Sequence, residues 1–183
     1  MKQVEDQFYI NKINKGDPAS YAFLVERYKD MAFTIALRIM RNREDAEDVA
    51  QEGFVKAYQQ LNRFEGKSKF STWLYTIVYR TAVTKLQKRG APVFSVDEDL
   101  SEHFVHSEVS PQIEAMQAEE QTKFIKQAIA KLSEMDGLLI TLFYMNENSV
   151  REIEEITGLS ASNIKVRLFR ARKILEAELR FLL

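Results

Sequence analysis

The sequence predicts an all-α fold of two small helical domains joined by an acidic linker, with a helix-turn-helix in the C-terminal domain. Glycine and proline are rare, at 6 and 3 of 183 residues, and alternating β-branched runs are few. Apolar residues instead recur with helical period along most of the chain. Between residues 93 and 112 the composition turns acidic and polar, without one lysine or arginine, and this stretch separates the two helical parts.

Composition limits the possible functions. Hydrophobic residues make up 45% of the chain, enough for packed cores, and the formal net charge is -1, so a basic surface must come from local clustering. The absence of cysteine excludes disulfide bonds and thiolate metal sites. No charged leader followed by an apolar run opens the chain, and no apolar stretch reaches the length of a membrane span. We therefore expect a cytoplasmic protein.

The first predicted domain contains helices over residues 4–15, from Pro18 to Met40, over 43–61, and from about 70 to Gly90. Pro18 suits a first helical turn, and the break after Met40 comes at Arg41 and Asn42. A polar loop over 62–69 precedes the last of these helices, which Ser68 or Ser71 could cap.

The third of these helices is acidic in its first half. Carboxylates in the first turn, Glu44 and Asp45, suit the positive end of the helix. The same argument does not explain Asp48, Gln51 and Glu52, which project well past the first turn. We expect a basic protein partner to dock there.

Residues 64–89 combine aromatic and basic side chains. Helical spacing places a core face at Phe70, Trp73, Leu74, Ile77, Val78 and Thr81. It places a solvent-facing side at Thr72, Thr76, Arg80, Val83 and Gln87, with Tyr75 and Tyr79 beside it. Positive charge comes from Arg63, Lys67, Lys69, Arg80, Lys85, Lys88 and Arg89. Such charge attracts phosphates, and aromatic rings beside it stack on unpaired bases, so nucleic-acid binding is one interpretation of this stretch. Taken alone, the stretch is more typical of an ordinary amphipathic core helix with a solvated basic face, and the motifs in the rest of the chain raise the case for nucleic acid.

The second predicted domain, residues 113–183, ends in a helix-turn-helix. We expect a break at Met135 and Asp136, then a short buried helix over 138–144. Ser149 and Glu152 have the spacing of a capping box, Gly158 suits the turn, and Ser160 or Ser162 can cap the second helix. The buried stripe of that helix is Ile164, Leu168, Ala171 and Leu175. The opposite face, which suits the DNA major groove, consists of Ser162, Lys165, Val166, Phe169, Arg170 and Lys173.

These motifs together resemble a sigma factor of bacterial RNA polymerase, of the compact extracytoplasmic-function (ECF) group in the sigma-70 family. The resemblance rests on DAEDVAQEGFVKAY, RFEGKSKFSTWLYTIVYRTAV and EIEEITGLSASNIKVRLFRARKIL, in this order and spacing. It implies a promoter-recognition and promoter-melting function without catalysis. It also implies a minus-ten and polymerase-clamp domain over residues 1–92, a linker over 93–112 and a minus-thirty-five domain over 113–183.

The resemblance further implies roles for individual residues. The clamp of the polymerase largest subunit would be bound by Asp48, Gln51, Glu52 and Phe54. Minus-ten DNA, with one base flipped into a pocket, would be bound by Arg63, Phe64, Lys67, Lys69, Phe70, Trp73, Tyr75, Thr76 and Arg80. Minus-thirty-five DNA would be bound by Ser160, Ser162, Asn163, Lys165, Val166, Phe169, Arg170 and Lys173. The apolar helix from Leu138 to Tyr144 would meet the flap of the second-largest subunit, and an anti-sigma factor is an expected partner.

Some positions depart from the family pattern. Arg80 stands where asparagine is common, which implies a less common minus-ten preference. Glu154 stands where a helix-turn-helix usually has a small residue, so its carboxylate must tilt outward or find a partner.

Two other functions compete with the sigma-factor interpretation. A stand-alone helix-turn-helix regulator would bind duplex DNA but would need neither the Asp48, Gln51 and Glu52 surface nor the aromatic loop. A helical enzyme is a weaker alternative, because His103 and His106 lie in the predicted linker without a third ligand. The sequence predicts no catalytic residue, no metal site and no cofactor.

Overall fold

The computed structural model describes residues 2–90 and 118–180, and every regular element in this part of the chain is a helix. The N-terminal half consists of α1 (Lys2–Asn14), η1 (Pro18–Ser20), α2 (Tyr21–Met40), α3 (Arg43–Gln59), η2 (Leu61–Arg63) and α4 (Phe70–Lys88). The C-terminal half consists of α5 (Ala118–Ala130), α6 (Glu134–Ile140), the π-helical η4 (Thr141–Met145), α7 (Val150–Thr157) and α8 (Ala161–Glu178). The all-α prediction is confirmed. The predicted acidic linker, with His103 and His106, lies outside the described residues.

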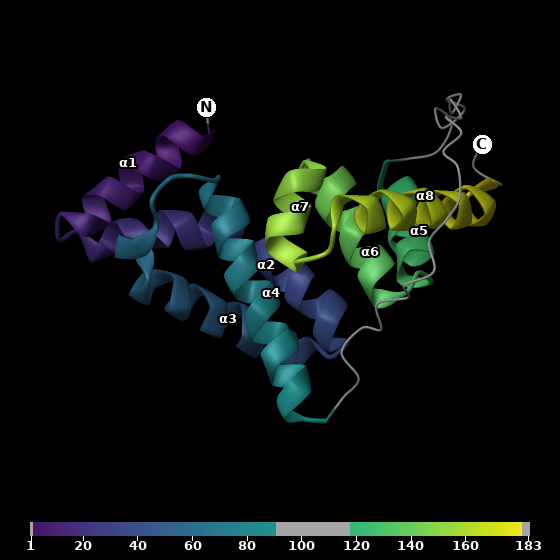
Figure 1. Ribbon diagram of the computed structural model, residues 1–183, viewed down its shortest axis with the longest axis horizontal. Helices are drawn as coiled ribbons and strands as arrows, with labels where there is room; N and C mark the ends of the chain where they lie inside the picture. The colour runs from purple at the N-terminus through teal and green to yellow at the C-terminus, as the bar shows by residue number, and fades with distance from the viewer. Residues whose placement is uncertain (1, 91–117, 181–183) are drawn as a thin grey trace.

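Helices α2, α3 and α4 pack side by side as the body of the N-terminal half, and α1 lies along α2 (Figure 1). Small residues let these helices approach closely. A Cβ atom added at Gly53 of α3 would lie 2.7 Å from a methyl carbon of Val78 on α4, so the α3–α4 packing requires a glycine there. Arg41 ends α2 in the left-handed conformation, and the Asn42 side chain caps α3 by accepting from the Asp45 N–H. The predicted break at these residues is confirmed.

The C-terminal half packs directly against the N-terminal half. Figure 1 shows α7 beside α4, and α6 contacts α2. The buried apolar side chains form one continuous cluster from Ile10 of α1 to Ala171 of α8. Described residues of the two halves therefore share one hydrophobic core, even though the sequence predicts two domains.

Local capping explains the helix-turn-helix. Ser149 and Glu152 form the predicted capping box at the start of α7, Gly158 ends α7 with φ 76°, and Ser160 caps α8. Two other predictions about helix ends are wrong. The break before α6 lies at 131–133 rather than at Met135, because Ser133 caps α6. Helix α4 begins after Lys69 without a side-chain cap, so neither Ser68 nor Ser71 caps it.

Candidate protein and nucleic-acid interfaces

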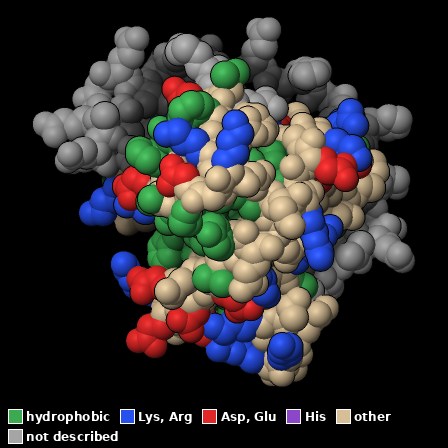
Figure 2. Space-filling model, turned by 90° about the vertical axis from the view of Figure 1, so that its left-hand side faces the viewer, with side chains coloured by type: hydrophobic (Ala, Val, Ile, Leu, Met, Phe, Trp, Pro, Cys, Tyr) green, Lys and Arg blue, Asp and Glu red, His purple; other side chains and the backbone are tan. Residues whose placement is uncertain are grey.

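An apolar groove opens between α2 and α3, with a volume of about 760 Å³. Its apolar lining consists of Pro18, Tyr21, Val25, Phe33, Ala50, Phe54, Val55 and Tyr58, and its polar lining of Lys29, Glu47, Gln51 and Gln59. Figure 2 shows hydrophobic side chains gathered on the end of the molecule that the N-terminal half forms. Exposed apolar surface beside carboxylates suits a protein partner that presents apolar and basic side chains.

The groove adjoins the residues that the sequence predicts for the polymerase. Asp48, Gln51 and Glu52 are exposed, as a docking surface requires, and Gln51 lines the groove itself. Phe54 differs from its neighbours because it is only 8% exposed and its carbonyl accepts from the Tyr21 hydroxyl at 2.7 Å. It therefore forms part of the groove lining rather than a projecting contact.

Sequence reasoning missed the exposed apolar residues of this surface. Val55 and Tyr58 lie on α3 outside its buried stripe, and both are exposed beside the groove. The signal in the sequence is that these apolar residues stand off the helical stripe through Val49, Phe54 and Ala57.

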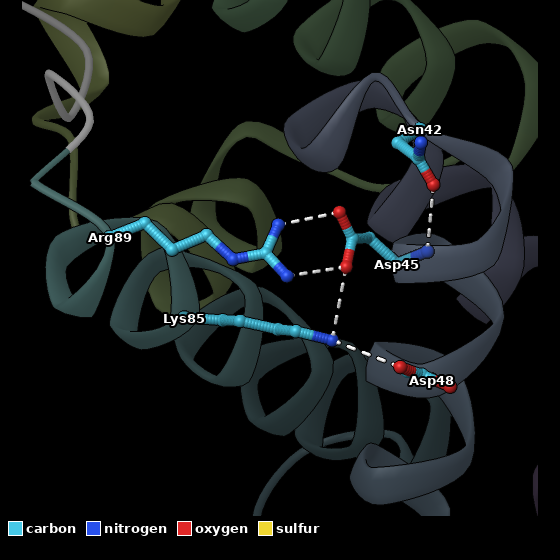
Figure 3. A network of polar contacts seen from close by, with 5 residues as sticks. All are labelled: Asn42, Asp45, Asp48, Lys85 and Arg89. Carbon is cyan, nitrogen blue, oxygen red and sulfur yellow. Dashed lines mark hydrogen bonds and ion pairs between the residues drawn. The ribbon is translucent and has the colours of Figure 1, made fainter.

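A polar network fixes the first turns of α3 against the end of α4 (Figure 3). The guanidinium of Arg89 donates to both Asp45 oxygens at 2.5 and 2.6 Å, and Lys85 lies 3.4 Å from Asp45 and 3.3 Å from Asp48. Hydrogen bonds from Arg89 and then Lys85 lower the pKa of Asp45 to about 2. Asp45, Lys85 and Arg89 therefore have a structural role here, while Asp48 remains mostly open to solvent.

An aromatic cluster lies where the 62–69 loop meets α4. The ring of Phe64 lies 5.7 Å from Phe70 and 5.3 Å from Trp73, measured between centroids. Phe70 is buried, while Phe64 and Trp73 are half-buried. Exposed basic residues surround the cluster at Arg63, Lys67 and Lys69, and Lys67 is ion-paired with Glu65. The structure thus brings the predicted loop aromatics together and leaves two of them accessible to a base.

The predicted solvent-facing side of α4 is covered in this arrangement by α7. Thr72 is 0% exposed and donates to the Glu152 carboxylate at 3.3 Å, and the buried Thr76 hydroxyl lies 3.4 Å from the Glu155 carbonyl. The expectation that both threonines face solvent is therefore wrong for this arrangement, because it took no account of packing by the C-terminal half. Arg80, one turn further on, is exposed as predicted.

Tyr75 and Tyr79 were also expected beside that exposed side, and both are buried. The Tyr75 ring packs edge-on against Tyr28, and burial raises the pKa of both tyrosine hydroxyls on α4. Direct contact of Tyr75 with DNA is therefore inconsistent with its 1% exposure. The residues form the expected helix, but buried positions extend further around α4 than its apolar stripe through Leu74 and Val78 indicates.

Charged contacts also hold the C-terminal half against the N-terminal half. We call this packing of the two halves the closed arrangement. Lys69 pairs with Glu152 at 2.9 Å, and Arg41 pairs with Glu134. The Arg38 guanidinium donates to the Ile129 carbonyl near the end of α5 at 3.5 Å, and burial lowers the pKa of Arg38. In each contact the N-terminal half supplies the cation and the C-terminal half the oxygen, so the interface is electrostatically complementary.

Helix α8 leaves most of its predicted DNA-binding side chains open. Ser160, Ser162, Lys165, Arg170 and Lys173 are exposed, and Val166 and Phe169 are half-buried. The Lys173 ammonium lies 4.8 Å from the centroid of the Phe169 ring, a cation–π contact. Asn163 differs because its amide oxygen accepts from Arg167, which is also paired with Asp136 at 3.0 Å. Asn163 and Arg167 therefore have a structural role, because their contacts connect α8 to α6.

The Glu154 carboxylate, which the sequence places at an unusual position, is hydrogen-bonded in the structure. It accepts from the Ala161 N–H at 2.7 Å and so stabilises the N-terminus of α8. The unusual carboxylate thus ties the two helices of the helix-turn-helix together.

The predicted flap-binding helix over 138–144 is mostly core. Leu138, Leu139, Ile140 and Leu142 are all buried. Phe143 is half-buried, and Tyr144 and Met145 at the end of η4 are exposed. A partner at this helix would therefore meet its C-terminal end and not its whole length. Among the described residues no cluster of His, Asp or Glu has metal-binding geometry, and none of the helices there has the length and hydropathy to cross a membrane.

Comparison with known families gives two matches. The family model for Sigma-70 region 2 matches residues 24–91, and the model for Sigma-70, region 4 matches residues 125–175. The first covers α2 to α4 with the groove and the aromatic cluster, and the second covers the helix-turn-helix.

Relatives match over nearly their full length. The ECF RNA polymerase sigma factor SigW of Bacillus subtilis is 33% identical over 179 residues, which cover 93% of this chain and 95% of SigW. The RNA polymerase sigma-H factor of Pseudomonas aeruginosa is 31% identical over 189 residues, covering 100% of this chain and 98% of that protein. The ECF RNA polymerase sigma-E factor of Escherichia coli K12 is 33% identical over 181 residues, with 96% and 94% covered.

Solved structures share the fold. CnrH, in complex with the cytosolic domain of CnrY, aligns with a TM-score of 0.63 at 22% identity over 96% of this chain and 97% of CnrH. The sigma factor RpoE of Bartonella quintana, in complex with the anti-sigma factor NepR, also aligns with a TM-score of 0.63, at 24% identity over 87% of this chain and 96% of RpoE.

Proposed function

Because the chain belongs to the ECF group of the sigma-70 family and is an RNA polymerase sigma factor that directs promoter-specific transcription, we propose a division of work among its surfaces. The groove between α2 and α3 binds core polymerase, the aromatic cluster captures minus-ten DNA, and α8 reads minus-thirty-five DNA. In this proposal residues 1–92 and 113–183 are the two functional domains. The chain itself catalyses no reaction and acts in the cytoplasm with core polymerase.

The polymerase surface is supported by the combination of shape and charge on α3. Exposed Val55 and Tyr58 offer apolar area, and Asp48 and Glu52 add carboxylates at the side of the groove. A clamp helix of the largest subunit that presents apolar and basic residues would match both features. Phe54 contributes by shaping the groove.

The minus-ten surface is supported by the half-buried rings of Phe64 and Trp73 above buried Phe70. A flipped base needs a stacking partner, because unstacking from the duplex costs a few kcal/mol. Arg63, Lys67, Lys69 and Arg80 would bind the phosphates on either side. Thr76 joins this surface only after α7 has moved away.

The minus-thirty-five surface is supported by exposed polar and basic residues on the open face of α8. Lys165 and Arg170 have the length to reach base edges in the major groove, and Ser160 and Ser162 lie at the helix N-terminus, where phosphates bind well. Asn163 reaches DNA only if it releases Arg167.

The closed arrangement implies that the two domains separate before the minus-ten helix binds DNA. Helix α7 covers Thr72 and Thr76, whereas the groove and the face of α8 stay open. Polymerase can therefore dock on the closed chain. CnrH is solved in complex with the cytosolic domain of CnrY, and Bartonella quintana RpoE in complex with the anti-sigma factor NepR, which supports an anti-sigma partner for this chain as well.

Transcription from a randomised promoter library tests the proposed function. Core polymerase supplemented with this chain should yield discrete start sites whose upstream sequences share two elements, whereas core polymerase alone should not. The Lys165→Ala and Arg170→Ala variants should then relax the upstream element only. A library without shared elements would reject promoter recognition by these surfaces.

A further inference from the structure

A buried polar network where α1 meets α2 has no role in the surfaces described so far. Asp6 of α1 is only 3% exposed. Its carboxylate accepts from the Tyr28 hydroxyl at 2.5 Å and from the Arg27 guanidinium at 2.7 Å. Arg27 also pairs with the exposed Glu5 at 2.6 Å. A buried carboxylate is costly unless it is fully bonded, and Asp6 has a donor on each of its oxygens.

Tyr28 connects this network to the aromatic cluster. Its ring lies 5.6 Å from Phe70 and 6.1 Å from Tyr75, measured between centroids. Phe70 in turn lies 5.7 Å from Phe64 and 5.8 Å from Trp73. Because protein interiors are close-packed, a shift of the Tyr28 ring moves the ring of Phe70 that supports the two accessible aromatics.

The hydroxyl of Tyr28 acts as a hydrogen-bond donor to Asp6. Burial, together with the hydrogen bond to Asp6, raises the pKa of Tyr28, so the hydroxyl keeps its proton and remains a donor. Asp6 is the partner that fixes the far end of the Tyr28 ring. The α1 helix also reaches the 62–69 loop, where Gln7 lies beside Gly66. Helix α1 precedes the region-2 family match, which begins at residue 24.

We propose that Asp6 is a positioning residue for minus-ten base capture, which acts by holding Tyr28 and through it the plane of Phe70 beneath Phe64 and Trp73. This inference rests on the proposed role of the aromatic cluster. It assigns α1 a role in promoter melting that does not require α1 to contact DNA. A purely structural role for Asp6 would instead lower stability without a specific effect at Trp73.

The chain offers a direct probe, because Trp73 is its single tryptophan. Acrylamide quenching of Trp73 fluorescence in the full chain reports how accessible the cluster is. Tyr28→Phe removes only the hydroxyl. Asp6→Asn removes the charge and replaces one of the two acceptor oxygens by an NH2 donor, and the two substitutions together form a double-mutant cycle. Glu5→Gln is the matched control, because it makes the same carboxylate-to-amide change one residue away and also loosens Arg27.

We expect Tyr28→Phe and Asp6→Asn to change Trp73 quenching at full folding, and Glu5→Gln to leave it unchanged. In holoenzyme, Tyr28→Phe and Asp6→Asn should each lower the ratio of single-round transcription from a duplex promoter to that from a pre-melted template by about fivefold. This is the effect expected from the loss of one buried hydrogen bond. Asp6→Asn should add little in the Tyr28→Phe background, because both changes act through the same ring.

Three results would overturn the proposal. One is unchanged Trp73 quenching in Tyr28→Phe, a variant that keeps the core intact, and another is an equal change in Glu5→Gln. The third is changed quenching with an unchanged ratio of duplex to pre-melted transcription. Failure of the wild-type chain to direct transcription would instead reject the proposed function, and Trp73 quenching would then show only whether Asp6 holds the aromatic cluster in place.

Discussion

The Lys69 ammonium lies 2.9 Å from the Glu152 carboxylate, and this pair joins the residue before α4 to the first turn of α7 in the helix-turn-helix. The same carboxylate accepts from the Ser149 N–H at 2.8 Å in the capping box and from the Thr72 hydroxyl at 3.3 Å. Burial opposes ionisation of Glu152, but the hydrogen bonds from Lys69 and Ser149 outweigh it, and its pKa is lowered. One side chain thus stabilises a helix start and holds the two domains together.

Glu152→Gln should open the two domains without unfolding α7. Glutamine keeps the hydrogen bonding of a capping box but removes the charge that Lys69 binds. A partly exposed pair of this kind contributes at most about 1 kcal/mol, so the open fraction should rise by up to about fivefold. The distance between fluorophores placed on α3 and α8 measures this change. Glu155→Gln, an exposed neighbour on α7, is the control, and an equal response in both variants would count against the Glu152 contact.

Asp45→Asn should lower the melting temperature at neutral pH but not at strongly acidic pH. Because the pKa of Asp45 is about 2 in the folded chain and its ordinary value is 3.8, its stabilising effect is complete above pH 3.8. The effect is lost as the pH falls through about 2. Melting curves of wild type and variant should therefore converge between pH 4 and pH 2. A constant difference over this range would show that the Arg89 contact contributes no charge-dependent stability.

Gly53→Ala should destabilise the packing of α3 on α4. Alanine gains about 1 kcal/mol in helix propensity, but its Cβ would lie 2.7 Å from a Val78 methyl carbon, and overpacking of this kind costs about 1–3 kcal/mol. We expect a net loss of about 1 kcal/mol in urea unfolding. Val78→Ala removes buried methyl groups and is costly in the wild-type chain, but in the Gly53→Ala chain it also removes the clash and should therefore cost less. Additive losses in the double variant would contradict the clash.

Trp73→Ala and Phe64→Ala should reduce open-complex formation more than initial duplex binding. The two half-buried rings lie 5.3 Å apart at the proposed base-capture site, and stacking contributes about 1–3 kcal/mol per base. Permanganate reactivity of melted thymines separates the two steps. Phe64→Ala is the safer variant, because Trp73 also packs on buried Phe70. Equal losses in both steps by a folded variant would refute base capture.

Lys165→Ala and Arg170→Ala should weaken binding to the minus-thirty-five element by about 1–3 kcal/mol each if these residues read bases. Arg167→Ala should behave differently, because Arg167 is held by Asp136 and Asn163 and should affect thermal stability more than DNA affinity. Fluorescence anisotropy with holoenzyme at several salt concentrations distinguishes the roles. A smaller salt slope with unchanged sequence preference would show that the two residues bind phosphate only.

Local rules made much of the fold predictable. Asn42, Ser149 and Gly158 mark helix ends through contacts within a few residues, and the structure confirms the expected break at Asn42, the capping box at Ser149 and the turn at Gly158. The exposed positions of Glu52 and Arg170 also follow from helical period, because each lies off the buried stripe of its own helix.

Contacts between distant parts of the chain were not predictable in the same way. Thr72 and Thr76 are buried by a helix about 80 positions later, and no local pattern signals that packing. The partner of Glu154 is a backbone N–H on the other side of the turn, so this contact can be predicted only when the path of the turn is known. The groove beside Val55 likewise needs α2 and α3 together, so the sequence predicts the acidic residues near it but not its shape.

Co-elution with bacterial core RNA polymerase tests the central claim most directly. Wild-type chain and Asp30→Arg, an exposed charge reversal on α2 that does not line the groove, should both co-elute, whereas Glu52→Arg and Val55→Asp should not. That result would place the polymerase contact on α3 beside the groove. Co-elution of all four proteins, or of none, would contradict it.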